Sequence, residues 1–155
     1  AHPPATVRPP PRQRDGYTAG LAVHRYARSI MTPGLARLDY EKKVRAFMAG
    51  QLLKLGLISE EDIAEKPEDP PAVRHYYMHG TSHSLGIDVH DVGPANPVFA
   101  ENQVWTIEPG IYIAEEGIGV RIETDVLIRA EDTEDLIPCA PLEADEIEAI
   151  MAGRA

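Results

Sequence analysis

Apolar positions in the first part of the chain recur at a helical spacing. From Asp15 the pattern runs as one helix until Thr32-Pro33-Gly34 stops it. A second helix is predicted from Asp39, which can cap it, to Gly56, which is well placed to end it. Ser59 and the acidic residues behind it predict the capped start of a short third helix.

The pattern changes after the proline-containing loop at residues 66–71. Val104, Thr106 and Glu108 alternate with Trp105 and Ile107 up to a Pro109-Gly110 break, after which a second run resumes. The clearest strand is predicted at 119–129, where alternation separates an apolar face from a charged face. A last helix is predicted at about 143–151. Helices first and a mostly antiparallel sheet afterwards predict an α+β fold, with the helices packed on one face of the sheet.

Length and composition narrow the function classes. The chain has 155 residues, 43% of them hydrophobic, which suits one globular domain. Residues 1–14 hold five prolines and little to bury, so they are predicted to form a mobile lead before a domain at 15–155. The net charge of −10 argues against nucleic acid as a partner. No membrane-spanning run occurs and the single cysteine fits a reducing compartment, so a cytoplasmic location and no membrane partner are predicted.

Four histidines fall within sixteen residues: His75, His79, His83 and His90. Small residues flank these rings and leave room for a ligand or an ion. Each histidine taken alone is more often an ordinary surface or core residue, and an HxxxH pair is a weak signal. The glutamate of a zincin helix is absent, which argues against that type of zinc site.

Two glutamates could act together with these histidine rings. Glu108 lies at a predicted strand end, where a carboxylate can point into a cleft, and Glu123 lies on the charged strand face two residues after Arg121. An exposed Arg–Glu pair on a solvated sheet would explain Glu123 without any function. The alternative is one imidazole and two carboxylates converging on a divalent metal, a donor set that suits Mn²⁺, Co²⁺ or Zn²⁺.

Three motifs in order carry a resemblance to a known family. They are MHGTSHSLGIDVHDVG at 78–93, TIEPGIY at 106–112 and GIGVRIETD at 117–125. Together they resemble the C-terminal half of Xaa-Pro aminopeptidases (aminopeptidase P), which belong to the pita-bread metallopeptidases with prolidase and methionine aminopeptidase. Ser82, where prolidases more often have glycine, favours aminopeptidase P over prolidase. The resemblance implies half of a pita-bread fold and a partial metallopeptidase catalytic domain.

The resemblance also implies roles for single residues. His83, Glu108 and Glu123 would be metal ligands, with Glu123 bridging two ions in the complete family site. His79 and His90 would line the substrate pocket and hydrogen-bond the scissile carbonyl or the tetrahedral intermediate. The implied reaction releases an N-terminal residue that precedes proline, with Glu108 handling the proton of the attacking water. Tyr112 and Arg121 would hold the carboxylates and the pocket in place.

Two family ligands have no counterpart in this sequence. Family members supply two aspartates from a β-hairpin that precedes this region, and Asp15, Asp39 and Glu41 do not match that pattern. The chain is therefore expected to hold one ion or none, most readily Mn²⁺, and to be competent only when a longer gene product or a partner chain supplies the missing N-terminal half. Self-association is expected through the sheet edge that this half would otherwise pair with. The alternatives are a catalytically inactive pita-bread module that binds peptides or proteins, and a truncated relic that folds poorly.

Overall fold

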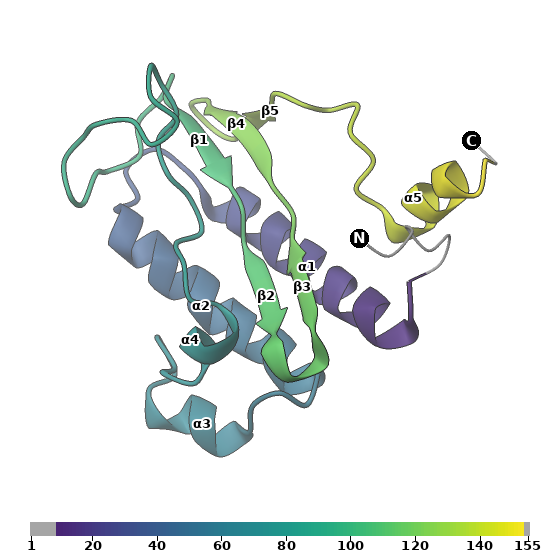
Figure 1. Cartoon of the computed structure of the whole chain (residues 1–155). Coiled ribbons are helices and arrows are strands. Elements are labelled where there is room, and N and C mark those ends of the chain that lie inside the picture. The colour runs from purple at the N-terminus through teal and green to yellow at the C-terminus, as the bar shows by residue number, and fades with distance from the viewer. Residues whose placement is uncertain (1–8, 154–155) are drawn as a thin grey trace.

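The computed structural model describes residues 9–153, and its two long helices form one layer against a long β-hairpin (Figure 1). The helices are α1 (Pro11–Ile30), α2 (Arg37–Lys54), α3 (Glu60–Glu65), α4 (Val73–Tyr76), the 3-10 turn η1 (Ala114–Glu116) and α5 (Ala144–Met151). The strands are β1 (Val104–Ile107), β2 (Gly110–Ile113), β3 (Ile118–Arg121), β4 (Thr124–Ile128) and β5 (Thr133–Asp135). No helix within the described residues has the length and apolar character needed to cross a membrane.

The hairpin is an antiparallel ribbon whose two arms are each interrupted once, at residues 108–109 and 122–123. β1 pairs with β4, β2 pairs with β3, and β5 pairs with β4 along its other edge. Ile107 faces Thr124 and Gly110 faces Arg121, so the register is unbroken across the gap between the two strand pairs. Pro109 lies in that gap and has no backbone N–H to give to the ladder.

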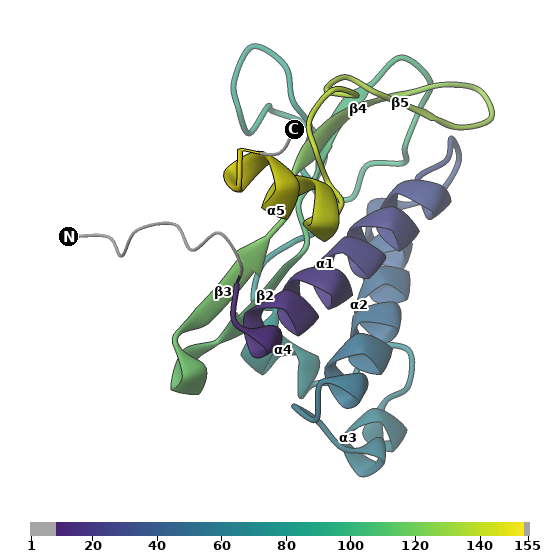
Figure 2. The same cartoon turned by 90° about the vertical axis from the view of Figure 1, so that its right-hand side faces the viewer.

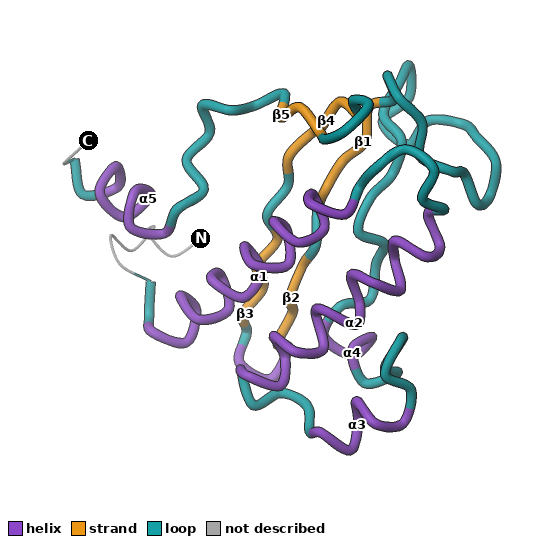
Figure 3. The backbone as a smooth tube through the Cα atoms, turned by 180° about the vertical axis from the view of Figure 1, so that it is seen from behind, coloured by secondary structure: helices purple, strands orange, loops and turns teal. Residues whose placement is uncertain are grey.

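The core lies between the hairpin and the two long helices. α1 and α2 run side by side across one face of the strands, as the views from the side and from behind show (Figures 2 and 3). The largest side chains that are almost fully buried there are Met31, Tyr40, Met48, Leu52, Tyr77, Phe99, Ile107, Ile111, Ile113 and Ile128. The predicted α+β fold with helices on one face of an antiparallel sheet is confirmed, and the opposite face of the hairpin is left for the polar side chains.

Two helix boundaries differ from the prediction. α1 begins at Pro11 rather than Asp15, so residues 11–14 are not part of an extended lead. Proline is favourable at the first helical position, and Arg12 anchors this turn by pairing with Glu116 and donating to the Leu55 carbonyl. Pro9 and Pro10 precede the helix, and residues 1–8 of the predicted lead lie outside the described residues. α2 begins at Arg37, so Asp39 lies inside its first turn and is not the cap.

Other local predictions are confirmed. Gly56 ends α2 with a φ of 69°, and the Leu57 N–H donates to the Leu52 carbonyl, as in a Schellman motif. Ser59 and Asp62 form a reciprocal capping box at the start of α3. The strand predicted at 119–129 is present as β3 and β4, separated at Ile122 and Glu123, whereas the sequence pattern did not predict α4 or β5.

Candidate metal centre

The two candidate carboxylates lie opposite each other on the polar face of the hairpin. Glu108 occupies the gap between β1 and β2, and Glu123 occupies the gap between β3 and β4. Because the register is unbroken, these two positions are direct cross-strand neighbours. Like charges that face each other across antiparallel strands destabilise a sheet unless something of opposite charge lies close by.

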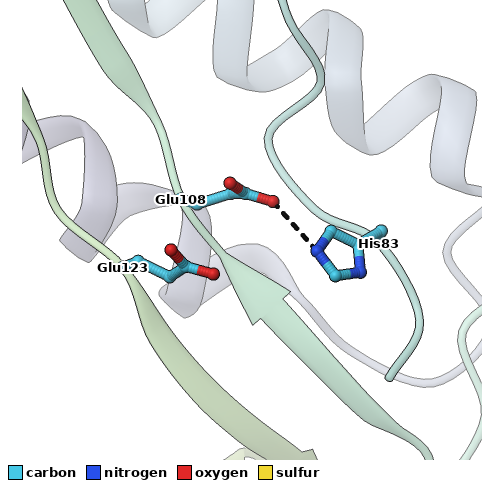
Figure 4. Close-up of side chains that lie close together, drawn as sticks. All are labelled: His83, Glu108 and Glu123. Atoms are coloured by element: carbon cyan, nitrogen blue, oxygen red, sulfur yellow. Dashed lines mark ion pairs between the residues drawn. The ribbon is translucent and has the colours of Figure 1, made fainter. Parts of the chain in front are cut away.

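The third candidate ligand is brought in by a strand-like segment along the free edge of β1. The Glu108 N–H donates to the Thr81 carbonyl at 2.8 Å and the Thr106 N–H donates to the His83 carbonyl at 3.0 Å. This pairing puts His83 opposite Thr106, on the same face as Glu108. One atom from each of His83, Glu108 and Glu123 lies within 4.8 Å of the others (Figure 4).

Hydrogen bonds fix the orientation of the imidazole. The His83 Nδ1 lies 3.1 Å from the Ser84 carbonyl, which can only accept, so Nδ1 carries a proton. The His83 Nε2 lies 3.2 Å from the Glu108 Oε1, and in a neutral ring both atoms are acceptors. A cation placed between these two atoms would have both as ligands. The donor set of one imidazole nitrogen and two carboxylates fits a divalent transition metal.

Thr106 is a part of the site that the motif comparison did not single out. Its hydroxyl accepts the His83 N–H at 3.1 Å and donates to the Glu108 Oε1 at 3.3 Å, so one buried side chain contacts both candidate ligands. The signal was available in the sequence, because alternation put Thr106 on the same strand face as Glu108.

In the described part of the chain, Arg121 is the one positively charged side chain that lies next to both Glu108 and Glu123. Its guanidinium lies 4.0 Å from Glu108 and 4.0 Å from Glu123. Its side chain is half exposed, so solvent screens these contacts and they contribute little to stability. Arg121 therefore offsets part of the repulsion between the two carboxylates.

The remaining predicted site residues surround this centre on the same side of the molecule. The His90 ring stacks on His83 with centroids 3.9 Å apart. The Tyr112 hydroxyl lies 2.9 Å from the His79 Nε2, while the His79 Nδ1 faces the Gly80 carbonyl. His75, the fourth histidine of the sequence cluster, instead contacts Glu115 on the surface.

Gly110 makes the His79–Tyr112 contact possible. Tyr112 folds back along β2, and a Cβ atom at Gly110 would lie 2.6 Å from its hydroxyl oxygen. Any side chain at position 110 would therefore displace the tyrosine from His79. The Pro-Gly pair has two roles at this point, since proline interrupts the ladder at Glu108 and glycine gives space to Tyr112.

An open hollow of about 470 Å³ borders the metal centre at His83. Arg37, Asp91 and Trp105 contribute to its wall, together with the exposed loop at 91–97. Of the three candidate ligands, His83 lines this hollow, whereas Glu108 and Glu123 are not among its lining residues.

Comparisons with known proteins show similar sequences and a similar fold. The model of "Metallopeptidase family M24" matches residues 5–130. The Xaa-Pro aminopeptidase of Escherichia coli is 34% identical over 90% of this chain, and Xaa-Pro aminopeptidase 2 of Streptomyces coelicolor is 34% identical over 92%. The low-pH form of E. coli aminopeptidase P superposes with a TM-score of 0.85 at 31% identity, covering 96% of this chain and 36% of that chain.

These matches extend over most of the chain but over a small part of each relative. The chain spans about a third of the length of the curated relatives it matches, 34% and 33% for the two named above. The family model itself covers well over half of the 155 residues. The chain therefore belongs to metallopeptidase family M24.

Proposed function

We propose that this chain carries the histidine-and-glutamate part of the active centre of a metal-dependent aminopeptidase that releases an N-terminal residue preceding proline. The observation that carries the proposal is the convergence of His83, Glu108 and Glu123, whose ligand atoms lie within 4.8 Å of one another. Two carboxylates in direct cross-strand register repel each other, and a cation held between them and the imidazole would remove that repulsion. The names of the curated relatives support the choice of peptide substrate.

The donor set also guides the choice of metal. One nitrogen and carboxylate oxygens suit Mn²⁺ best among the ions proposed, with Co²⁺ and Zn²⁺ as substitutes. His83, Glu108 and Glu123 would hold one ion in this chain. The family resemblance implies two aspartates with no counterpart in this sequence, so we propose that full activity requires them from a further segment or a partner chain. A cytoplasmic location stays a prediction from the sequence.

The residues of the site suit peptide hydrolysis. His83, Glu108 and Glu123 would hold a divalent ion, which would lower the pKa of a water molecule and polarise a carbonyl oxygen. Glu108 accepts a proton from the water that attacks the carbonyl carbon and passes it to the proline nitrogen as the C–N bond breaks. The resemblance assigns to His79 and His90 the hydrogen bonds that stabilise the oxygen that becomes negatively charged; His79 takes this role by exchanging its contact with the Gly80 carbonyl or the Tyr112 hydroxyl for one with the substrate. Arg121 and Tyr112 keep Glu108 and His79 oriented.

The test is a cleavage assay with matched peptides. The purified chain is incubated with Mn²⁺ and either an Xaa-Pro tripeptide or the same tripeptide with alanine in second place. We expect slow release of the N-terminal residue that requires metal, favours the proline peptide and is lost in Glu108→Gln. Equal cleavage of both peptides, or cleavage that survives a chelator, would contradict the proposal.

A binding assay separates this function from the alternative of an inactive module. A module that recognises peptides without turnover would bind the proline peptide with the same affinity in the presence and absence of Mn²⁺. The aminopeptidase proposal predicts tighter peptide binding when Mn²⁺ is present, because the carbonyl oxygen then gains an electrostatic partner.

A further inference from the structure

A buried carboxylate outside the metal centre holds the segment that carries the histidines. Glu41, on α2, is 3% exposed. Its two oxygens accept the Thr81 N–H at 2.9 and 3.1 Å, and its Oε2 also accepts the Thr81 hydroxyl at 2.8 Å. Charge-assisted hydrogen bonds of this kind are stronger than neutral ones, and Thr81 makes all of them with one partner.

Thr81 in turn is connected to two of the candidate ligands, Glu108 and His83. Its carbonyl accepts the Glu108 N–H at 2.8 Å, and His83 follows two residues later on the same strand-like segment. Because the Thr81 hydroxyl donates to Glu41, the Tyr77 hydroxyl must donate to it in turn, at 2.5 Å. The peptide at Thr81 is thus held from the helix side by Glu41 and from the hairpin side by Glu108.

Two arginines on the same face of α2 balance the charge of Glu41. The guanidinium of Arg37 lies 3.9 Å and that of Arg45 3.7 Å from its carboxylate, one helical turn before and one after. Burial raises the pKa of Glu41, while the Thr81 hydrogen bonds and the arginines act in the opposite direction. A buried carboxylate with this many partners is costly to build and is more rigid than an exposed one.

We propose that Glu41 is a positioning residue of the metal centre. By holding Thr81, it fixes the position and orientation of the 79–83 segment relative to β1, so that the imidazole of His83 lies next to Glu108. Outer partners of this kind orient the ligands and raise metal affinity. The prediction about metal affinity rests on the proposed function, whereas the positioning of the 79–83 segment by Glu41 can be measured on the chain without metal.

The matched control is the other buried carboxylate of this region. Asp69 is 8% exposed and contacts Arg45, as Glu41 does, but its recorded partners do not include the 79–83 segment. Asp69→Asn therefore removes a buried charge from the same arginine without touching the histidines. Glu41→Ala removes every contact to Thr81, and Glu41→Gln keeps an acceptor for the Thr81 N–H while removing the charge.

The first measurement is Co²⁺ affinity by calorimetry, with thermal unfolding of the same samples. We expect Glu41→Ala to bind Co²⁺ about 10-fold more weakly than the parent chain, the lower end of the range for outer partners. Glu41→Gln should fall between the two, and Asp69→Asn should lower the melting temperature without changing the affinity. Unchanged Co²⁺ affinity in folded Glu41→Ala and Glu41→Gln would overturn the proposal.

The second measurement needs no metal and is made by amide hydrogen exchange. Glu41→Gln should speed exchange at the Thr81 and Glu108 amides by about 10-fold, while Asp69→Asn leaves both unchanged. If the parent chain binds no Co²⁺ but these amides respond as expected, the proposed function fails and the positioning role stands. If Co²⁺ binds and the amides are equally protected in Glu41→Gln, the positioning role fails instead.

Discussion

The two sides of the metal centre are built differently. On one side, His83 and Glu108 have side chains only 18% and 15% exposed, and both contact the Thr106 hydroxyl, His83 through its backbone N–H. On the other side, Glu123 is 42% exposed, and its recorded partner among the described residues is Arg121 at 4.0 Å. One side is held before any ion arrives, and the other keeps rotamer freedom that binding must remove.

This difference indicates which residues dominate affinity in the isolated chain. A preorganised ligand loses little entropy when a cation binds, whereas a solvated carboxylate must give up both motion and hydration. His83 and Glu108 are therefore expected to determine whether metal binds, and Glu123 to modulate how tightly it is held.

The largest expected effect comes from removing the two glutamates separately. We expect Glu108→Ala to weaken Co²⁺ binding by about 100-fold or more and Glu123→Ala by about 10-fold, since loss of a held ligand costs at least as much as loss of an outer partner. Calorimetric titration measures both. Glu134→Ala, which removes an exposed carboxylate on β5 paired with Arg129, is the control that should bind normally. Equal losses at Glu108 and Glu123 would remove the distinction between the two sides.

The next effect concerns the support beneath Glu123 and depends on pH. His24 on α1 is buried against Thr124 at 2.9 Å, and burial lowers its pKa to about 4. Asp135 opposes that shift, while Arg28 and Arg25 add to it. The unfolded chain takes up a proton below about pH 6.5 whereas the folded chain stays neutral at His24 down to about pH 4, so stability falls between these values.

The size of this acid effect is measurable by denaturant unfolding. Between pH 7 and pH 5 the contribution of His24 should lower the free energy of unfolding by about 2 kcal/mol. His24→Leu should lack that part of the pH dependence. An unchanged pH profile in His24→Leu would show that another group titrates in this range.

A smaller effect is expected from the shared hydroxyl on the held side. Thr106→Val keeps the shape of the side chain but leaves the His83 N–H without its acceptor. We expect about 10-fold weaker Co²⁺ binding and a loss of about 1 to 2 kcal/mol in stability. Thr133→Val, which removes a hydroxyl that contacts Arg28, is the control: similar stability loss with normal Co²⁺ affinity. Unchanged Co²⁺ affinity in Thr106→Val would show that the Thr106 hydroxyl does not orient the ligands.

The smallest effect is expected next to His83. The Tyr40 and Ser82 hydroxyls lie 3.0 Å apart in a buried pair. Tyr40→Phe should cost about 1 kcal/mol in stability and change Co²⁺ affinity less than the Thr106 variant, because the Glu41–Thr81 contact remains. Denaturant unfolding and calorimetry on the same sample decide this. A larger loss of Co²⁺ affinity in Tyr40→Phe than in Thr106→Val would show that Tyr40, rather than Thr106, mainly holds His83 in place.

Local patterns predicted most of the fold because they depend on nearby residues. The Gly56 helix end, the Ser59 capping box and the break at Pro109 all follow from steric or hydrogen-bonding properties of single residues. The predicted start of α1 was wrong for two reasons: Pro11 is a local signal for a first helical position, and Arg12 in the same turn is held by Glu116, far along the chain. β5 was missed for a similar reason, since it is defined by pairing with β4.

The sequence named the candidate site residues but not the contacts that hold them in place. Alternation put Glu108 and Glu123 on polar strand faces, and the resemblance named His83 as their partner. Their direct opposition needed the register of the hairpin, which the sequence alone does not give. Glu41 was counted among the acidic residues without a role, because its contact with Thr81 joins a helix to a segment forty residues away.

The central claim is that His83, Glu108 and Glu123 share one cation, and Mn²⁺ broadening of nuclear magnetic resonance signals tests it most directly. Mn²⁺ broadens signals near its binding site, even when binding is weak. We predict that signals of these three residues disappear first, while those of the acidic first turn of α3, Glu60, Glu61 and Asp62, persist. Broadening centred on that turn or spread over the acidic surface, with His83 unaffected, would contradict the account.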